Sequence, residues 1–549
     1  MLLKDPKEGL TPTSSNPYDL DTKGAIKFKN EPLVDFGVRE NRETMIRTLS
    51  DFRARNLGSE YPLHIGGKEI KTGRFIDSFN PSNPSELVGR VHLAGVAEAE
   101  SAMQAAKSAY ATWRLTPVEK RAAMVDKLAD IMARDRMTLN AVEILEAGKP
   151  WEEADGDIAE AIDFCRYYAR EMRKLAKPQR VGGVPGEVSL YHYQPRGVSV
   201  VIAPWNFPLA ILTGMVAASL VTGNTVVFKP AEQTPVIAAF LMRALKEAGF
   251  PAGTANFLNG YGEEIGEYLT GHADAGLICF TGSKAVGLRI LEKAAKTGQG
   301  QKQVKRVICE MGGKNAMIID SDADLDEAVT GVLYSAFGFA GQKCSAASRV
   351  IVLEEIYDRF VDRLVEATKS LKVANAEEPD AYLGPVIDDE AHKRILQTIE
   401  KGRTEAKLLY QGQTPAKGYF VGPTIFADVN PNGSLAQNEI FGPVLAIIRA
   451  KDIDHALEIA NSTEYALTGG VYSRSPANIE KVKWGFEVGN LYINRGITGA
   501  MVDRHPFGGF KMSGAGSKTG GPDYLLNFVE PRVVTENTLR RGFAPVEEG

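Results

Sequence analysis

One cysteine of the chain stands in a setting that suits a nucleophile. Cys344 follows a glycine-containing turn in FGFAGQKCSAASRVIVL and precedes an apolar, β-branched run. Its neighbours Lys343 and Ser345 are polar, whereas Cys279 and Cys309 lie within apolar runs. The thiolate is the nucleophilic form of cysteine, and an electropositive, partly exposed setting favours it. The residues predict a reactive Cys344, and a structural cysteine stays open as the alternative.

A carboxylate at the end of a predicted strand is the candidate base. Glu310 ends the apolar run RVICE and is followed by Met311 and two glycines. An acid between apolar segments is partly desolvated, which raises its pKa toward that of a useful general base. The alternative is a strand-end carboxylate that only accepts backbone hydrogen bonds.

Two further segments place polar groups directly after predicted strands. FKPAEQTP carries Lys229 and Glu232, which could hold a ribose at the carboxyl edge of a parallel sheet. FTGSKAVG carries Ser283 where a helix begins, and the free N–H groups of a helix start suit a phosphate. The alternatives are a solvated ion pair in the first segment and a glycine turn capped by Ser283 in the second.

Several common catalytic and binding patterns are missing from the sequence. It contains no GxGxxG, GxxxxGK[ST], GxSxG or HExxH, and its seven histidines lie far apart, so no metal site is predicted. Four cysteines without a CxxC pair indicate a reducing compartment. A net charge of −5 without a basic stripe argues against a nucleic-acid partner, and 44% hydrophobic with 24% charged residues is typical of a globular protein.

The elements that must position these residues alternate between strand and helix. Apolar runs at 198–203, 224–229 and 276–280 are typical of strands that are covered on both faces. Helical patterns follow the first two strands at 208–221 and from Thr234-Pro235, with Thr234 as the expected N-cap. This alternation predicts a doubly wound parallel sheet.

The remaining segments complete the predicted organisation. Residues 1–57 are expected to form an extended arm and one helix, and 95–177 show long helical patterns. The segment 181–197 has the strand and turn residues of a hairpin, and a second alternating block covers about 310–500. The uncharged stretch from Gly197 to Phe228 contains prolines and a glycine, so we interpret it as buried rather than membrane-spanning. The N-terminus has no pattern of a secretory signal or transit peptide.

Taken together, the segments resemble the aldehyde dehydrogenase superfamily from about residue 60 to 535. The segments that carry the resemblance, in their order, are PWNFP (204–208), KPAEQTP, FTGS, EMGGKNA (310–316), GQKCSAASR (341–349) and EIFGP (439–443). Within the superfamily, TGAMVDRHPFGGFKMSG, KTGGPDYLLNFVEP and KNEPLVDF resemble the branch that oxidises L-glutamate γ-semialdehyde. Met311 and the run 503–505 depart from the common pattern, and both departures concern the substrate pocket.

The resemblance implies a role for each matching residue. Cys344 would be the nucleophile, Glu310 the base for thioester hydrolysis, and Asn206 an oxyanion donor together with the backbone N–H of Cys344. The implied cofactor-binding residues are Pro204, Trp205, Lys229, Glu232, Thr281, Gly282, Ser283, Glu439 and Phe441. The implied substrate-binding residues are Phe207, Ser345, Gly499, Ala500 and Phe507. Without the resemblance, Gly499 and Ala500 would be interpreted as a tight turn.

The resemblance also implies an α/β fold of the aldehyde dehydrogenase type, with a Rossmann-type cofactor domain, a catalytic domain and a small β flap. The predicted boundaries are 58–180 with 198–309 for the NAD-binding domain, 310–515 for the catalytic domain, and 181–197 with 516–549 for the flap. The flap would join two copies into a homodimer or a higher assembly of dimers. A carboxylate on the adenine ribose disfavours a 2′-phosphate, so NAD is the expected cofactor, with no metal.

The function implied is the NAD-dependent oxidation of L-glutamate γ-semialdehyde, in equilibrium with 1-pyrroline-5-carboxylate, to L-glutamate in proline catabolism, in the cytoplasm. Three alternatives stay open. The chain could be a general aldehyde dehydrogenase, an acyl-phosphate reductase, or a protein that kept the fold without catalysis. The acyl-phosphate reaction would not need Glu310 as a base, and the presence of Cys344, Asn206 and Glu310 argues against loss of catalysis.

Overall fold

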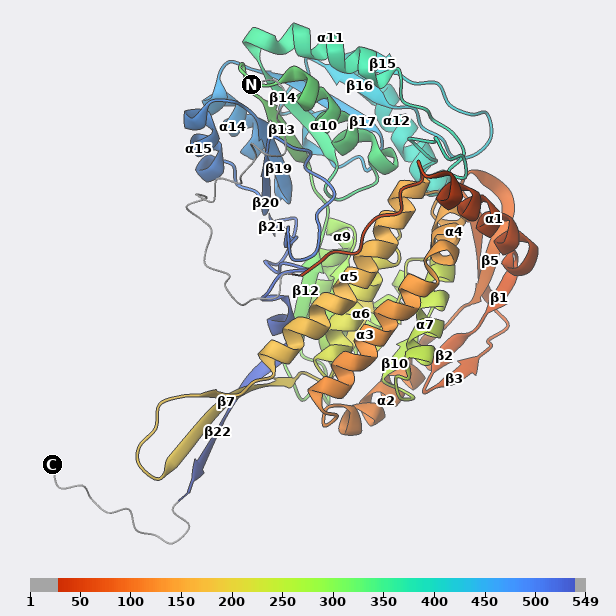
Figure 1. The fold of residues 1–549 in the computed structure, drawn as a ribbon, viewed down its shortest axis with the longest axis vertical. Helices are drawn as coiled ribbons and strands as arrows, with labels where there is room; N and C mark the ends of the chain where they lie inside the picture. Colours follow the sequence, from red (N-terminus) through yellow and green to blue (C-terminus); the bar gives the residue numbers. More distant parts are fainter. Residues whose placement is uncertain (1–27, 539–549) are drawn as a thin grey trace, which may run out of the picture.

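Two parallel sheets, one above the other in Figure 1, organise the chain, and a narrow hairpin extends from the lower one. The computed structural model describes residues 28–538. In the lower sheet the strand order is β12-β11-β8-β9-β10-β2-β3. The strands are Arg306–Glu310 (β12), Ala275–Thr281 (β11), Val198–Ile202 (β8), Thr225–Lys229 (β9), Ala255–Phe257 (β10), Leu63–Ile65 (β2) and Lys68–Ile70 (β3). The first five are parallel, and the last two join antiparallel.

The strand order reverses beside β8, which fixes where a ligand can bind. After β8 the chain adds β9 and β10 on one side, and β11 and β12 are later added on the other side. The loops that leave β8 and β11 therefore diverge to opposite faces and open a crevice at the carboxyl ends of these strands. The predicted strands at 198–203, 224–229 and 276–280 are confirmed, and their ends lie at this crevice.

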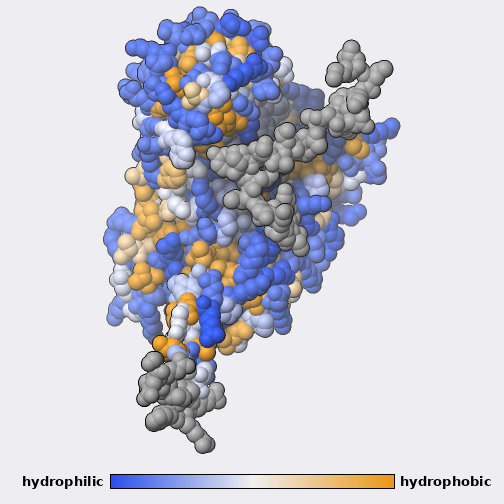
Figure 2. Space-filling view, turned by 60° about the vertical axis from the view of Figure 1, so that its left-hand side comes forward, coloured by the Kyte–Doolittle hydropathy of each residue, from blue (hydrophilic) through white to orange (hydrophobic). Residues whose placement is uncertain are grey.

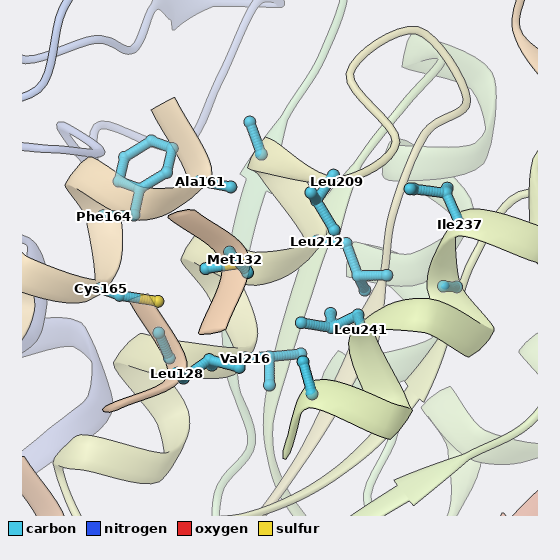
Figure 3. Packing of buried hydrophobic residues seen from close by; sticks show 14 of the residues in the cluster. Leu128, Met132, Ala161, Phe164, Cys165, Leu209, Leu212, Val216, Ile237 and Leu241 are labelled. Atoms are coloured by element: carbon cyan, nitrogen blue, oxygen red, sulfur yellow. The ribbon is translucent and has the colours of Figure 1, made fainter. Parts of the chain in front are cut away.

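Helices cover both faces of the lower sheet. They are Val96–Trp113 (α2), Val118–Arg134 (α3), Arg136–Glu146 (α4), Trp151–Leu175 (α5), Ala210–Val221 (α6), Pro235–Ala248 (α7), Glu267–Gly271 (α8) and Lys284–Ala295 (α9). Figure 3 shows how α3, α5, α6 and α7 meet in a core of aliphatic side chains that also holds Phe164 and Cys165. Because α6 lies between this core and the sheet, nearly all of its side chains are buried and it has no polar face.

The upper sheet has the order β15-β16-β17-β14-β13-β19-β20. Its strands are Lys407–Gln411 (β15), Thr424–Ala427 (β16), Val444–Ala450 (β17), Ala347–Leu353 (β14), Asn315–Ile319 (β13), Thr468–Tyr472 (β19) and Asn490–Ile493 (β20). All neighbours are parallel except β15 and β16. Its helices are Leu325–Phe337 (α10), Tyr357–Thr368 (α11), Asp389–Glu405 (α12), Ser434–Gln437 (α13), Ile453–Asn461 (α14) and Pro476–Gly485 (α15).

Small elements complete the described chain. The helix expected in the N-terminal segment is Arg39–Asn56 (α1), and the first 27 residues of that segment lie outside the described residues. Ser59–Tyr61 (β1), Asn83–His92 (β5) and Phe75–Asn80 (β4) form a three-stranded sheet, and Tyr465–Ala466 (β18) pairs with Phe510–Lys511 (β21).

The predicted hairpin is present and gains a third strand. Gln179–Arg180 (β6) and Glu187–Pro195 (β7) are antiparallel, and Val529–Asn537 (β22) pairs with β7 along its whole length. Figure 1 shows this unit extending from the body, and Figure 2 shows hydrophobic side chains on the same projection. Val184 and Val533 are among its exposed apolar residues.

The helix α7 begins where the sequence predicts, at Thr234-Pro235, but a different side chain caps it. Thr234 occupies the N-cap position of α7, but its hydroxyl is buried and makes no hydrogen bond in the described chain. The carboxylate of Glu146, at the end of α4, caps the helix instead. It accepts from the backbone N–H groups of Val236 at 2.7 Å and Ile237 at 2.9 Å. The Glu146 carboxylate caps the helix in place of the Thr234 hydroxyl because a charged acceptor binds free helix N–H groups more strongly than a hydroxyl does.

Across residues 28–538, no helix is long and apolar enough to cross a bilayer. The uncharged stretch from Gly197 to Phe228 is divided between β8, α6 and β9, as its proline and glycine residues indicated.

Candidate active site

A cavity of about 630 Å³ lies at the crevice of the lower sheet and reaches the upper domain. The loops after β8, β9 and β11 supply one wall, and residues of the upper domain supply the other. Every residue predicted to bind a cofactor lines it. These residues are Pro204, Trp205, Lys229, Glu232, Thr281, Gly282, Ser283, Glu439 and Phe441. Cys344 and Asn206 line the same cavity.

At one end, the cavity presents an ion pair that can still bind a ligand. Lys229 Nζ is 2.7 Å from Glu232 Oε1, and Glu232 Oε1 also accepts from the backbone N–H of Gly262 at 2.9 Å. The loop ion pair considered as the alternative therefore exists, although Lys229 is buried rather than solvated. Because Glu232 is partly exposed, its second oxygen can accept from a hydroxyl group of a ligand.

The start of α9 supplies a site for a negative group. Ser283 is the N-cap residue, and its hydroxyl accepts from Val286 N–H at 3.4 Å. The capping predicted as the alternative is thus present. The same turn, Thr281 to Ser283, faces the cavity, where the partial positive charge of a twelve-residue helix favours phosphate oxygens.

The cavity is also lined by a carboxylate that packs on a glycine. Glu439 Oε1 accepts from Gly313 N–H at 2.8 Å. A Cβ atom built at Gly312 would lie 2.2 Å from Glu439 Oε2, so any larger residue would displace the carboxylate from this position. Nearby, Phe441 has a positive φ of 54°, and its ring meets the Trp205 ring edge-on at 5.4 Å.

Cys344 borders the cavity after a short turn, Gly338–Gly341, in which Phe339 and Ala340 both have positive φ angles. The thiol is partly accessible, as predicted. The predicted electropositive setting is wrong, because Lys343 Nζ points away and pairs with Glu153 Oε1 at 2.7 Å. Burial, followed by the negative charge of nearby acids, raises the pKa of Cys344 to about 12.

Asn206 is buried beside the nucleophile loop. Its side-chain Nδ2 donates to the backbone oxygen of Gln342 at 3.0 Å, two residues before Cys344. This contact fixes the amide plane and leaves its second N–H free to donate to another acceptor. The predicted oxyanion donor and the predicted nucleophile are therefore held together.

Sequence reasoning missed the residue that supports Asn206 from behind. Lys149 is completely buried, and its Nζ donates to the backbone oxygen of Asn206 at 3.0 Å and to Asp157 Oδ2 at 2.7 Å. The ammonium group also lies 4.2 Å from the ring centre of Phe207. No local pattern around LEAGKP reveals these contacts, because Asn206 follows 57 residues later.

Glu310 lies at the end of β12, beside the cavity wall rather than in it. Its Oε1 accepts from Ser517 Oγ at 3.3 Å, and its Oε2 is buried without a hydrogen-bond partner in the described part of the chain. Burial raises the pKa of Glu310 to about 8, which agrees with the predicted desolvation. Both the predicted base and its alternative, a hydrogen-bonded strand end, describe part of this environment.

None of the five predicted substrate residues lines the cofactor cavity. Ser345 Oγ donates to Thr498 Oγ1 at 3.0 Å, which joins the nucleophile loop to the turn at 498–500. Gly499 has a φ of +73°, and a Cβ there would lie 3.2 Å from the hydroxyl oxygen of Tyr334. The turn thus requires glycine on two grounds, its backbone conformation and the close approach of Tyr334.

Within residues 28–538 no cluster of three His, Cys, Asp or Glu side chains could hold a metal ion. The described groups offer a thiol and an amide donor in a cavity with contacts for hydroxyl and phosphate groups, and a desolvated carboxyl beside that cavity.

Comparison with known proteins agrees with this arrangement. Residues 69–534 match the aldehyde dehydrogenase family. The chain belongs to the aldehyde dehydrogenase family. Among curated relatives of this aldehyde dehydrogenase, the 1-pyrroline-5-carboxylate dehydrogenase of Geobacillus sp. (strain WCH70) is 51% identical over 510 residues, 93% of this chain and 99% of the relative. The enzyme of that name from Bacillus subtilis (strain 168) is 48% identical over 512 residues, with the same shares covered.

Solved structures of similar proteins have the same fold. A 1-pyrroline-5-carboxylate dehydrogenase from Thermus with bound NAD matches this aldehyde dehydrogenase with a TM-score of 0.92 and 47% identity, over 94% of this chain and 100% of that one. Proline utilization A from Bdellovibrio bacteriovorus matches with a TM-score of 0.93 and 64% identity. That match covers 95% of this chain and 54% of the Bdellovibrio chain. The α/β fold expected from the family resemblance is thereby confirmed.

Proposed function

We propose that this aldehyde dehydrogenase oxidises L-glutamate γ-semialdehyde, which is in equilibrium with 1-pyrroline-5-carboxylate, to L-glutamate with NAD, as a step of proline catabolism. One observation carries the proposal. A single cavity has Cys344 and Asn206 at one end and the Lys229–Glu232 pair at the other. The names of the curated relatives support this substrate, and the NAD bound in the Thermus structure supports this cofactor.

The residues along the cavity fit NAD. Lys229 and Glu232 would bind the adenine ribose, and Glu232 would disfavour a 2′-phosphate at that position because both are negative. The turn at Thr281–Ser283 would bind the pyrophosphate at the start of α9. Glu439, seated on Gly312, would bind on the nicotinamide side. When bound there, NAD accepts the hydride that leaves the substrate carbon.

The first half of the reaction forms a bond to Cys344. The thiolate attacks the aldehyde carbon, and the carbonyl oxygen becomes an oxyanion. The free N–H of the Asn206 amide and the backbone N–H of Cys344 would donate to this oxygen, and donors that are already fixed cost no reorganisation. Because the pKa of Cys344 is raised to about 12 without ligands, the thiol must lose its proton as the cavity fills.

The second half releases the product. Loss of hydride from the thiohemiacetal restores the carbonyl group and leaves a thioester on Cys344. Glu310 Oε2, which has no partner in residues 28–538, would accept a proton from the attacking water. The resulting tetrahedral adduct expels the Cys344 thiolate and leaves the γ-carboxylate of glutamate. A carboxyl with a pKa near 8 is well matched to this proton transfer near neutral pH.

Recognition of the remote end of the substrate rests on the other group of predicted residues. Ser345 Oγ and the backbone N–H groups of Gly499 and Ala500 would bind the α-carboxylate, since consecutive N–H groups in a small-residue turn cradle an anion. Phe207 and Phe507 would pack on the aliphatic stem. The Phe207 ring is already fixed by the buried Lys149.

Assembly and location belong to the same proposal. The unit of β6, β7 and β22 exposes apolar side chains and an open strand edge, both of which a second copy could cover. We therefore propose a homodimer, or a higher assembly of dimers. The predicted boundaries of the NAD-binding domain, the catalytic domain and the flap are part of the same proposal. A cytoplasmic location fits the free Cys344 that the reaction requires.

The test is a comparison of kcat/KM for aldehydes with NAD, followed by absorbance of the reduced cofactor. Glutamate semialdehyde should exceed a carboxylate-free aldehyde of similar length by at least about 100-fold, because an unmatched carboxylate site is costly to desolvate. A ratio near one would make this chain a general aldehyde dehydrogenase. Absence of reduced cofactor with every aldehyde, together with activity on an acyl phosphate, would favour the reductase alternative.

A further inference from the structure

The carboxylate of Glu310 is held by a segment that follows it by about 200 residues. Ser517 Oγ donates to Glu310 Oε1 at 3.3 Å, and the nearby backbone N–H of Gly509 lowers the pKa of the carboxyl, against the effect of burial. The main chain of the same segment runs beside β12, where Met311 N–H donates to Ser513 O at 2.8 Å. The orientation of the predicted base therefore depends on the path of residues 508–517.

Lys518 fixes that path from the far side. Its Nζ donates to the backbone oxygen of Gly489 at 2.6 Å, to Asn490 Oδ1 at 3.0 Å and to the backbone oxygen of Gly508. Asn490 in turn binds the same turn, with Nδ2 donating to Pro506 O at 2.9 Å. The ammonium group of Lys518 thus joins the edge strand β20 to the turn at residues 506–510, which includes Gly509.

The backbone segments around this turn pack in close contact with one another. A Cβ at Gly489 would lie 2.0 Å from the oxygen of Gly508, and a Cβ at Gly508 would lie 2.0 Å from the oxygen of Ser517 and 3.0 Å from Glu310 Oε1. Main chain therefore rests directly on main chain between β20 and the carboxylate. A shift of the ammonium group would be transmitted to Glu310 through these contacts.

The positive charge of Lys518 also interacts electrostatically with Glu310. Lys518 is half-buried and makes no ion pair with a carboxylate in residues 28–538. Burial lowers the pKa of Lys518, and the charge that opposes this effect is that of Glu310. Glu310 also acts electrostatically on Cys309, Cys344 and Tyr524, none of which is a cation.

We propose that Lys518 is a positioning residue for the reaction. It holds the 506–510 turn against Glu310, and its positive charge favours the ionised form of that carboxyl for the release of the thioester. The inference rests on the proposed function and assigns Lys518 to its second half-reaction only.

The experiment uses Lys518→Met in the full-length chain, because methionine has a similar length and no charge. Two quantities are measured with NAD and glutamate semialdehyde: the pre-steady-state burst of reduced cofactor and the pH dependence of kcat. The burst should be retained, because hydride transfer does not need Glu310 as the base for water. The acid limb of the kcat profile should move to higher pH by about half to one unit, so that kcat at pH 7 falls roughly 3- to 10-fold.

Matched variants separate positioning from general stability. Lys518→Arg keeps the charge and should restore most of the acid limb. Lys305→Met removes another buried lysine, whose Nζ donates to Gly271 O at 3.1 Å, and it should leave the profile unchanged. Ser517→Ala removes a direct donor to Glu310 and should move the acid limb in the same direction as Lys518→Met.

The outcomes are distinct. If Lys518→Met turns over with the wild-type acid limb, the role of Lys518 is refuted. If Lys518→Met does not fold, Lys518→Gln replaces it with the same expected shift. If wild-type protein forms no reduced cofactor with any aldehyde, the proposed function fails, and that result is independent of the variants.

Discussion

Gly312 offers a direct test of how the cavity is built. In Gly312→Ala, the new Cβ would lie 2.2 Å from Glu439 Oε2 and 2.4 Å from Oε1. The carboxylate would have to retreat by about 1 Å to reach an ordinary contact distance. That movement breaks the 2.8 Å hydrogen bond from Gly313 N–H to Glu439, which now fixes the carboxylate.

The expected magnitude follows from the contact with NAD that the displaced Glu439 carboxylate would no longer make. A hydrogen bond to a charged group contributes roughly 1.5–3 kcal/mol. Since about 1.4 kcal/mol corresponds to a tenfold change in Kd, we expect Gly312→Ala to weaken NAD binding by about 10- to 100-fold. The Trp205 ring lines the same cavity, so quenching of tryptophan fluorescence on titration with NAD, checked by calorimetry, measures the change.

The control is Gly298→Ala, because a Cβ at that position meets nothing within 4 Å. This variant should bind NAD as the wild type does. A Gly312→Ala protein that is folded by circular dichroism and binds NAD within twofold of the wild type would refute the role of Glu439.

Three further predictions concern the reacting groups. Cys344→Ala should abolish aldehyde oxidation while NAD still binds. Cys279→Ala, at a buried site, should change only stability. Substantial turnover by Cys344→Ala would exclude the thioester. Glu310→Gln should give one burst of reduced cofactor and then stall. In the wild type, kcat should rise about tenfold per pH unit below about pH 8. The reason is that the pKa of Glu310 is raised to about 8 and only its ionised form accepts a proton. An acid limb near pH 4.5 would contradict this. Ser345→Ala, which also removes the 3.0 Å bond to Thr498, should lower kcat/KM for glutamate semialdehyde roughly 10- to 100-fold and leave a carboxylate-free aldehyde nearly unaffected; equal losses for both aldehydes would argue against a carboxylate contact.

The residues of the cavity could be predicted because their positions follow from local sequence. Lys229 and Thr281 are the last residues of apolar strands, Asn206 follows another such strand shortly after its end, and the ends of parallel strands meet at one edge of a sheet. The family resemblance then assigned a role to each residue. Where a short apolar run determines the position of a side chain, the sequence is sufficient to place it.

The surroundings of the same residues could not be predicted, because they are brought together only by the folded chain. Lys343 was expected to activate Cys344 from the adjacent position, yet its ammonium group pairs with Glu153 from α5. Thr234 was expected to cap α7, yet Glu146 does so from another helix. In both cases the expected interaction with a sequence neighbour is replaced by one with a charged residue from another helix. A buried charged group needs a hydrogen-bonding or oppositely charged partner, and the folded chain supplies it from a distant segment.

The long separation between Glu310 and Ser517 has a consequence for a chain that is still being made. Ser517 is synthesised 207 residues after Glu310. At about 5–20 residues per second, a ribosome needs roughly 10–40 s to cover that interval. During this time Cys344 has already been translated, but the donors that orient the carboxylate do not exist. A nascent chain that met an aldehyde would therefore have no means of releasing an acyl group from its cysteine. Competence to complete the cycle therefore arrives only after the segment that carries Ser517 has been made.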